Sequence, residues 1–357
     1  MNPLARLAEL GQSIWQDDIR RDQLDDGTIA TRIADWAVTG LTSNPSIFDK
    51  AIAGSDLYDA AIAELVAGGM TDPEELFFEL AIQDLQRAAD LFAPVFEQTG
   101  GLDGCVSLEV SPTLADDAAA TTAQAAELFA RADRPNLMIK IPGTPAGLPA
   151  ITSTIAAGIP VNVTLLFSVE QYLAQAEAWI TGLEQRHAAG GSLTNLPSVA
   201  SIFVSRWDVA ANAELPTEHH NKLGVAVCAA AYAAYRELLS SDRFAVLAVA
   251  GATPQRLLFA STSTKDPALP DTLYVEQLAA DNTVNTMPVN TLIAFADHGT
   301  VPAGLPADGG PAALDVAVVA NAGVDVNGLG RLLQEQGTQS FVASWDSLMA
   351  SLRDQVA

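Results

Sequence analysis

Basic residues are scarce in this chain. Its 357 residues include only 18 lysines and arginines against 43 aspartates and glutamates, a formal net charge of −25 at pH 7. Polyanions such as nucleic acids and acidic membrane surfaces repel a protein of this charge. The composition therefore predicts no nucleic-acid or membrane partner, and an anionic substrate must be held by a few locally placed cations.

Cysteine and histidine are also rare. Cys105 and Cys228 cannot form a disulfide framework, and their apolar surroundings predict buried free thiols in a reducing compartment. The four histidines lack the His-Glu-x-x-His spacing or a comparable one, so no metal site is predicted. No glycine-rich loop of the kind that binds nucleotides follows a strand.

Long apolar runs are missing. Residues Met1–Gly11 lack a basic segment followed by an apolar one, so no secretory signal is predicted. The longest alanine-rich run, Val225–Tyr235, is too short to span a bilayer. We expect a soluble, cytoplasmic protein.

Short β-rich runs alternate with longer alanine-rich stretches, which is typical of a parallel sheet with crossover helices. Strands are predicted at Ser13–Asp17, Gly40–Asn44, Val106–Val110, Asn136–Ile141, Val161–Phe167, Ser198–Ser205, Arg256–Thr262 and Asn282–Met287. A further apolar run, Ala245–Ala250, also fits a strand. The clearest helices are predicted at Ala115–Ala132, Val169–Arg186 and Lys222–Leu239.

Eight strands that are each followed by a helix predict an α/β fold, a closed (β/α)₈ TIM barrel with additional helices. An open doubly wound sheet is the alternative. No linker or charge block divides the chain, so residues 1–357 are expected to form one catalytic domain. The loop Thr300–Pro311 is expected to be an exposed excursion before a last helical region.

One of the four lysines lies in an apolar strand. Because alternate residues of a strand share a face, Ile139 and Ile141 can meet the helices while Lys140 points into the barrel. A buried ammonium ion without a partner is costly, and a lysine that is deprotonated there can attack a carbonyl and form a Schiff base. The alternative is an ammonium ion paired with an inward carboxylate in a satisfied core network.

Other strands also direct polar side chains inward near their carboxyl ends, where barrels carry out their chemistry. By alternation these residues are Asp17, Thr42, Asn44, Ser107, Glu109, Asn162 and Thr164. A barrel interior built only for packing would have valine, isoleucine or leucine at these positions. The pattern favours an active site.

These segments resemble transaldolases of the longer bacterial type. The matching stretches, in family order, are Leu-Thr-Ser-Asn-Pro-Ser-Ile-Phe (41–48), Val-Ser-Leu-Glu-Val (106–110), Pro-Asn-Leu-Met-Ile-Lys-Ile-Pro-Gly-Thr (135–144), Val-Asn-Val-Thr-Leu-Leu-Phe-Ser (161–168), Ala-Ser-Ile-Phe-Val-Ser-Arg (200–206) and Asn-Thr-Val-Asn-Thr-Met-Pro (282–288). The resemblance implies a (β/α)₈ barrel and Schiff-base chemistry that needs no metal and no organic cofactor.

The resemblance also implies the reaction. A dihydroxyacetone unit passes from a ketose phosphate, sedoheptulose 7-phosphate or fructose 6-phosphate, to an aldose phosphate, glyceraldehyde 3-phosphate or erythrose 4-phosphate. This belongs to the non-oxidative pentose phosphate pathway. The expected partners are therefore small sugar phosphates.

By the same resemblance, Lys140 is the Schiff-base lysine and Asp17 takes the proton of the C4 hydroxyl during cleavage. Strand alternation favours Asp17 over its neighbour Asp18. Glu109 and Thr164 resemble a pair that holds a water for proton transfer. The alternative for Glu109 is an ion partner of Lys140 without a proton role.

Asn44 and Asn162 resemble the amides that hold substrate hydroxyls, although Pro45 makes helix capping an alternative for Asn44. Ser201 and Arg206 resemble phosphate ligands. Arg206 breaks the alternation with Ser201, so it is expected in a loop beyond the strand, with a surface salt bridge as its alternative role.

The chain differs from the shorter branch of the family after the seventh strand. That branch has an arginine for phosphate there, whereas this chain has Ser261 and Lys265 on one face, and Lys265 could supply the charge.

Two other functions are alternatives. Fructose 6-phosphate aldolases release free dihydroxyacetone and carry a tyrosine where this chain has Phe203, so Phe203 favours transfer. A catalytically silent sugar-phosphate-binding barrel would be expected to lack at least one of Asp17, Glu109 and Lys140, and all three are present.

Overall fold

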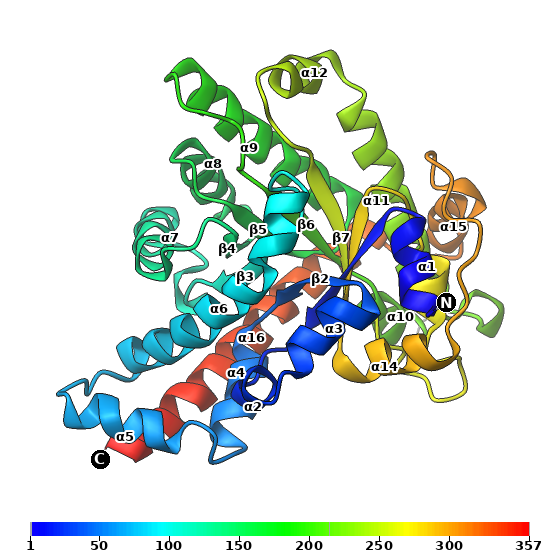
Figure 1. Cartoon of the computed structure of the whole chain (residues 1–357). Helices are drawn as coiled ribbons and strands as arrows, with labels where there is room; N and C mark the ends of the chain where they lie inside the picture. The colour runs from blue at the N-terminus through cyan, green and yellow to red at the C-terminus, as the bar shows by residue number, and fades with distance from the viewer. Residues whose placement is uncertain (1, 214, 357) are drawn as a thin grey trace.

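A computed structural model describes residues 2–213 and 215–356 of the chain. Eight parallel strands close in chain order into a barrel that helices surround (Figure 1). The strands are β1 (Gln12–Asp17), β2 (Val38–Thr42), β3 (Val106–Glu109), β4 (Leu137–Pro142), β5 (Val161–Leu166), β6 (Ser198–Phe203), β7 (Gln255–Ala260) and β8 (Thr283–Met287). The predicted (β/α)₈ barrel is confirmed. The open-sheet alternative is wrong, because β1 pairs with β8 as well as with β2.

Helices cover the outside of the barrel and its carboxyl end. They are α1 (Pro3–Glu9), α2 (Arg21–Asp25), α3 (Thr28–Trp36), α4 (Pro45–Ala53), α5 (Asp59–Ala67), α6 (Pro73–Gln98), α7 (Ala118–Ala132), α8 (Leu148–Ala156), α9 (Val169–Ala188), α10 (Ser205–Ala211), α11 (Leu223–Leu239), α12 (Asp242–Val249), α13 (Leu273–Gln277), α14 (Val289–His298), α15 (Gly310–Asn321) and α16 (Val326–Val356). Two 3₁₀ turns, η1 (Pro112–Leu114) and η2 (Thr217–His219), complete the described elements.

The eight predicted strands lie within two residues of their expected bounds. The ninth apolar run, Ala245–Ala250, is not a strand and lies mostly in α12. The Ser241 hydroxyl caps this helix by accepting the Phe244 N–H at 3.2 Å. Phe244 and Leu247, three residues apart, are buried, while Val249 is 91% exposed. This is helical spacing, which a short apolar run does not reveal by itself.

The last part of the chain consists of two helices. The loop before them is mostly exposed or half-buried, as expected. α15 and α16 meet at an angle of 98°, and α16 packs against α4, α6 and β5. This placement brings α16 to the carboxyl end of the barrel.

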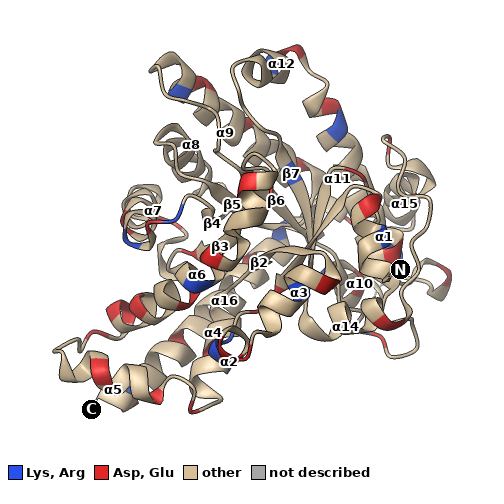
Figure 2. Ribbon diagram, viewed as in Figure 1, with Lys and Arg blue, Asp and Glu red and all other residues tan. Residues whose placement is uncertain are grey.

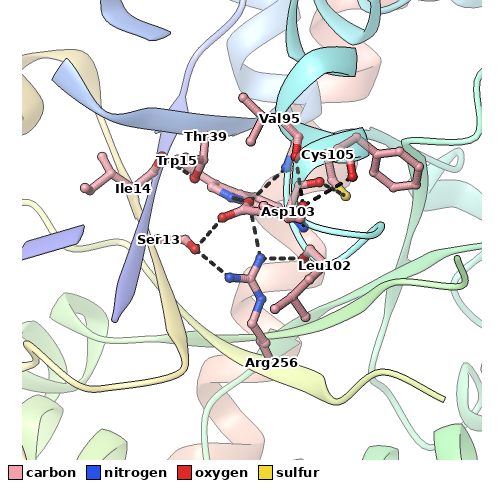
Figure 3. A network of polar contacts seen from close by, with 12 residues as sticks. Ser13, Ile14, Trp15, Thr39, Val95, Leu102, Asp103, Cys105 and Arg256 are labelled. Carbon is pink, nitrogen blue, oxygen red and sulfur yellow. Dashed lines mark hydrogen bonds and ion pairs between the residues drawn. The ribbon is translucent and has the colours of Figure 1, made fainter. Parts of the chain in front are cut away.

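A buried polar network closes the opposite end of the barrel (Figure 3). Arg256 of β7 donates to the Ser13 hydroxyl at 2.5 Å and to the Leu102 carbonyl at 2.9 Å, and its guanidinium is 3.2 Å from Asp103. Asp103 also accepts hydrogen bonds from the Trp15 indole N–H at 2.8 Å and from the Ser13 hydroxyl. The network ties β1, β7 and the loop before β3 together, far from the carboxyl ends of the strands.

Cys105 and Cys228 are buried free thiols, as predicted. Among the described residues, no single helix is long and apolar enough to cross a membrane. The bent pair α15–α16 reaches that length and apolarity only when the two helices are counted together.

Candidate active site

A cavity of about 370 Å³ opens at the carboxyl end of the barrel. Nine of the predicted site residues line it: Asp17, Asn44, Lys140, Thr164, Ser201, Phe203, Arg206, Ser261 and Lys265. The other two, Glu109 and Asn162, do not line the cavity but contact residues that do. The alternation of side chains along the strands therefore places most of the predicted residues around one space.

Lys140 lies at the buried end of this cavity. Its side chain extends from β4 and is 5% exposed, and its Nζ is 3.0 Å from Glu109 Oε2. The same ammonium donates a hydrogen bond to the Ser43 carbonyl at 3.0 Å. Lys140 and Glu109 therefore form the ion pair that was the alternative to a Schiff-base lysine. Lys140 nevertheless borders the cavity.

Glu109 stands beside Lys140 on β3, because the two residues are register partners in the sheet. Burial raises the pKa of the Glu109 carboxyl, and the neighbouring Lys140 charge opposes that rise. A carboxylate whose protonation is favoured by burial can accept a proton from the adjacent ammonium. Within the described residues, Glu109 Oε1 and Thr164 Oγ1 have no hydrogen-bond partner, so both can hold a further polar group.

Asp17 ends β1 and is half-buried at the cavity. The Thr42 hydroxyl donates to Asp17 Oδ1 at 2.6 Å, and the hydroxyls of Thr42 and Thr286 are 2.7 Å apart. Burial raises the pKa of Asp17, whereas Lys140, the Thr42 hydrogen bond and Lys265 lower it. The neighbouring Asp18 is hydrogen-bonded to Gln23 at 2.7 Å instead.

The two asparagines have different surroundings. Asn44 is the N-cap of α4, and its side-chain oxygen accepts the Ile47 N–H at 3.0 Å, which is the alternative foreseen for it. Asn44 also lines the cavity. Asn162 is fully buried: its amide N–H donates to Ser107 Oγ at 3.0 Å, and its oxygen accepts from the Ser201 hydroxyl at 2.7 Å. Asn162 therefore supports the floor of the cavity.

Arg206 is not in a loop, as the broken alternation had suggested, but is the second residue of α10. The strand β6 ends at Phe203 and the helix begins two residues later, so the turn of the helix carries Arg206 back to the cavity. Its guanidinium lies 5.3 Å from the centre of the Phe203 ring, and burial lowers its pKa.

Three cations surround the outer part of the cavity: Lys50, Arg206 and Lys265. Within residues 2–213 and 215–356, none of them forms an ion pair with a carboxylate. Burial and the neighbouring charges of Arg206 and Lys50 lower the pKa of Lys265, whose Nζ donates to Ser263 Oγ at 2.6 Å. A group of cations that repel one another is suited to bind a multiply charged anion.

Lys50, Thr286 and Phe341 also line the cavity and were not predicted as site residues. Lys50 could have been found, because Ser46, Ile47 and Lys50 share one face of the helix that Asn44 caps. Phe341 carries no such signal. It reaches the cavity only because the last helix of the chain returns to the barrel.

A family model and several known proteins match this sequence over nearly its whole length. A family model described as "Transaldolase/Fructose-6-phosphate aldolase" matches residues 14–352. The chain is 46% identical to "Transaldolase" of Thermobifida fusca, with 100% of this chain and 99% of the relative covered. It is 45% identical to "Transaldolase" of Frankia alni, covering 99% and 98%, and 44% identical to "Transaldolase" of Mycolicibacterium smegmatis, also covering 99% and 98%.

Proposed function

The chain belongs to the transaldolase/fructose-6-phosphate aldolase family and has the activity of a transaldolase, and we propose that Lys140 carries this activity. The observation that supports the proposal best is the position of its amine, which borders the cavity and is 3.0 Å from a buried carboxylate. A lysine in this position can pass its proton to Glu109 and attack a ketone as the neutral amine.

The donor in this proposal is fructose 6-phosphate or sedoheptulose 7-phosphate. Lys140 Nζ forms a bond to the C2 carbonyl carbon while Glu109 accepts the ammonium proton. The resulting carbinolamine loses its hydroxyl as water, with Glu109 returning a proton through a water held with Thr164, and an iminium ion remains. The burial that raises the pKa of Glu109 favours its function as both acceptor and donor of this proton.

Cleavage of the carbon–carbon bond follows and depends on Asp17, which lines the same cavity. Asp17 accepts the proton of the C4 hydroxyl, the C3–C4 bond breaks, and its electron pair passes to the iminium ion. The aldose phosphate leaves, and a three-carbon enamine stays on Lys140. Addition to the aldehyde of the acceptor reverses these steps, with Asp17 returning its proton to the new hydroxyl. The hydrogen bond from Thr42 fixes Asp17 for both steps.

The phosphate of each substrate is bound by Lys50, Arg206 and Lys265 in this proposal, with Ser201 and Ser261 on the same cavity wall. The protein carries a large excess of acidic residues, so a cluster of cations at one place gives the anion a favourable location. Phe203 keeps an apolar ring beside the intermediate, which favours transfer over release of free dihydroxyacetone. We place the enzyme in the cytoplasm and in the non-oxidative pentose phosphate pathway.

Borohydride trapping with fructose 6-phosphate tests the assignment of Lys140. The parent protein should gain a reduced three-carbon adduct on the peptide that contains Lys140, seen by mass spectrometry. Lys140→Ala should lose both the adduct and turnover. Lys222→Ala is the matched control, because Lys222 lies outside the cavity and donates to the Glu218 carbonyl at 2.6 Å. An adduct that persists in Lys140→Ala would refute the assignment.

The products of fructose 6-phosphate and erythrose 4-phosphate separate the candidate functions. Sedoheptulose 7-phosphate is the product expected of the transferase. Free dihydroxyacetone as the main product would indicate the lyase, and neither product would indicate a silent binding barrel.

A further inference from the structure

Helix α16 places one face along the mouth of the barrel. Gln334, Gly337, Phe341 and Ser344 are spaced three or four residues apart, so they lie on one side of the helix. Gln334 Nε2 donates to the Gly143 carbonyl at 3.0 Å and to the Leu165 carbonyl at 2.9 Å. These bonds anchor the helix to the ends of β4 and β5.

The other end of this face is also fixed. The hydroxyls of Ser344 and Ser46 are 2.6 Å apart, which connects α16 to α4. Gly337 packs so closely that a Cβ atom there would be 2.9 Å from a Leu165 methyl group. Phe341 lies between the two anchored points, so its position is set by contacts on both sides.

Phe341 contacts the reactive end of the cavity. It is 5% exposed and lines the cavity, and its ring centre is 5.5 Å from Lys140 Nζ. In the proposed function the iminium ion carries its positive charge at this same nitrogen. The face of an aromatic ring attracts a cation at this distance, and the ring also occupies volume that water could otherwise fill.

The three-carbon intermediate on Lys140 has two fates. In transfer, its C3 carbon attacks an acceptor aldehyde. In release, C3 takes a proton, water adds to the C2 iminium carbon, and the C2–N bond then breaks to give free dihydroxyacetone and the lysine amine. Transfer also ends with the addition of water to an iminium ion, but only after the new carbon–carbon bond has formed. Excluding water while the intermediate still has three carbons therefore favours transfer.

We propose that Phe341 is a specificity-determining residue: its ring excludes water from the lysine-bound intermediate and so favours transfer over hydrolysis. This inference rests on the proposed function of Lys140. It assigns to the last helix of the chain a role in selecting the reaction, in addition to its packing against the barrel.

The test compares products in Phe341→Leu, Phe341→Val and Phe341→Ala, each given fructose 6-phosphate with erythrose 4-phosphate. The ratio of free dihydroxyacetone to sedoheptulose 7-phosphate should rise as the side chain becomes smaller. We expect about a tenfold rise in Phe341→Ala, which corresponds to about 1.4 kcal/mol in relative barrier height. Phe341→Leu should remain near the parent ratio, because it keeps most of the apolar volume. The valine variant still decides the question if the alanine variant does not fold.

Leu348→Ala is the control for a purely structural effect. Leu348 is a fully buried residue of α16 that does not line the cavity, so loosening the helix there should lower both products together. An unchanged ratio in Phe341→Val and Phe341→Ala, with normal borohydride trapping on Lys140, would overturn this inference alone. Failure of trapping in the parent protein would instead overturn the proposed function.

Discussion

At the level of single residues, the three cations at the cavity that have no carboxylate partner among the described residues separate substrate binding from chemistry. Lys50, Arg206 and Lys265 surround its outer part, whereas Lys140 and its carboxylate partner lie at the buried end. Phosphate binding and Schiff-base chemistry therefore depend on different side chains. Each can be altered by itself.

Arg206→Ala should mainly weaken the binding of phosphorylated substrates. Hydrogen bonds to a charged group contribute about 1.5–3 kcal/mol, so KM for fructose 6-phosphate should rise by about 10- to 150-fold. Activity with unphosphorylated fructose should change little. Steady-state kinetics with both sugars measures this difference, with Lys222→Ala as the control. An equal loss with both sugars would contradict a phosphate role for Arg206.

The charge of Asp17 should lower stability at neutral pH. Because burial raises its pKa, the folded chain holds a proton on this carboxyl more tightly than the unfolded chain does. The resulting stabilisation is complete below the unfolded pKa and is lost as pH rises through the folded pKa. Asp17→Asn should therefore unfold at higher urea concentration than the parent at pH 7, and the difference should shrink as pH falls toward about 4.

Asp26→Asn is the control of opposite sign. Asp26 is exposed, and hydrogen bonds from Thr28 lower its pKa, so its charge favours the folded state. Its replacement should slightly reduce stability at pH 7. If Asp17→Asn also destabilised the protein at pH 7, burial would not be the dominant influence on that carboxyl.

Alternation along strands predicted the inward side chains because each direction is fixed by its own strand. It correctly places Asp17, Lys140 and Thr164 at one cavity. For Arg206 it correctly indicated a position beyond the strand, but the expected loop is a helix. Strand alternation also cannot predict that Phe341 lies at the cavity, because only tertiary packing brings the last helix to the barrel.

At the level of elements, the buried network at the amino end of the barrel should contribute more to the free energy of unfolding than the surface ion pairs do. Asp103→Ala would leave the Arg256 charge buried, with its guanidinium only 4% exposed and one partner lost. Removing one partner of a buried pair costs about 3–5 kcal/mol. Urea unfolding should show a loss of this size, with activity per folded molecule retained because the cavity is at the other end.

The matched control is Asp90→Ala. It breaks the Arg134–Asp90 pair, in which the nitrogen and oxygen are 2.6 Å apart and the aspartate side chain is 59% exposed. Exposed pairs contribute about 0–1 kcal/mol, so little stability should be lost. Equal losses in the two variants would show that the Arg256 network does not hold the strands together.

Strands were easier to predict than the helices between them. A buried parallel strand is a short, nearly continuous apolar run, and all eight such runs are strands. The α12 segment has the same local composition, and its true state follows from a cap at Ser241 and a three-residue burial pattern. The chain also turns between α15 and α16, which makes them two helices. The apolar residues on both sides of this turn do not reveal its position in the sequence.

For the whole molecule, acidic residues are spread over the outer helices, with fewer basic residues between them (Figure 2). A net charge of −25 destabilises the compact state through self-repulsion. Salt reduces the screening length from about 30 Å at 0.01 M to about 8 Å at 0.15 M. The midpoint of thermal unfolding should therefore rise over this range at pH 7.

The same salt series near the sequence pI of about 4.2 provides the comparison, because the net charge is then close to zero. The effect of salt should largely disappear there. A midpoint that falls with salt at pH 7 would mean that attractive ion pairs outweigh the repulsion.

The seam between β1 and β8 joins residues 12–16 to residues 283–287. During synthesis, β1 is among the first segments to leave the ribosome, yet its partner on this side is made only after most of the chain. Until then the growing sheet has an unpaired edge that can associate with other chains. Because β8 lies in the final quarter of the chain, the barrel can close and cover this edge only after that quarter has been translated.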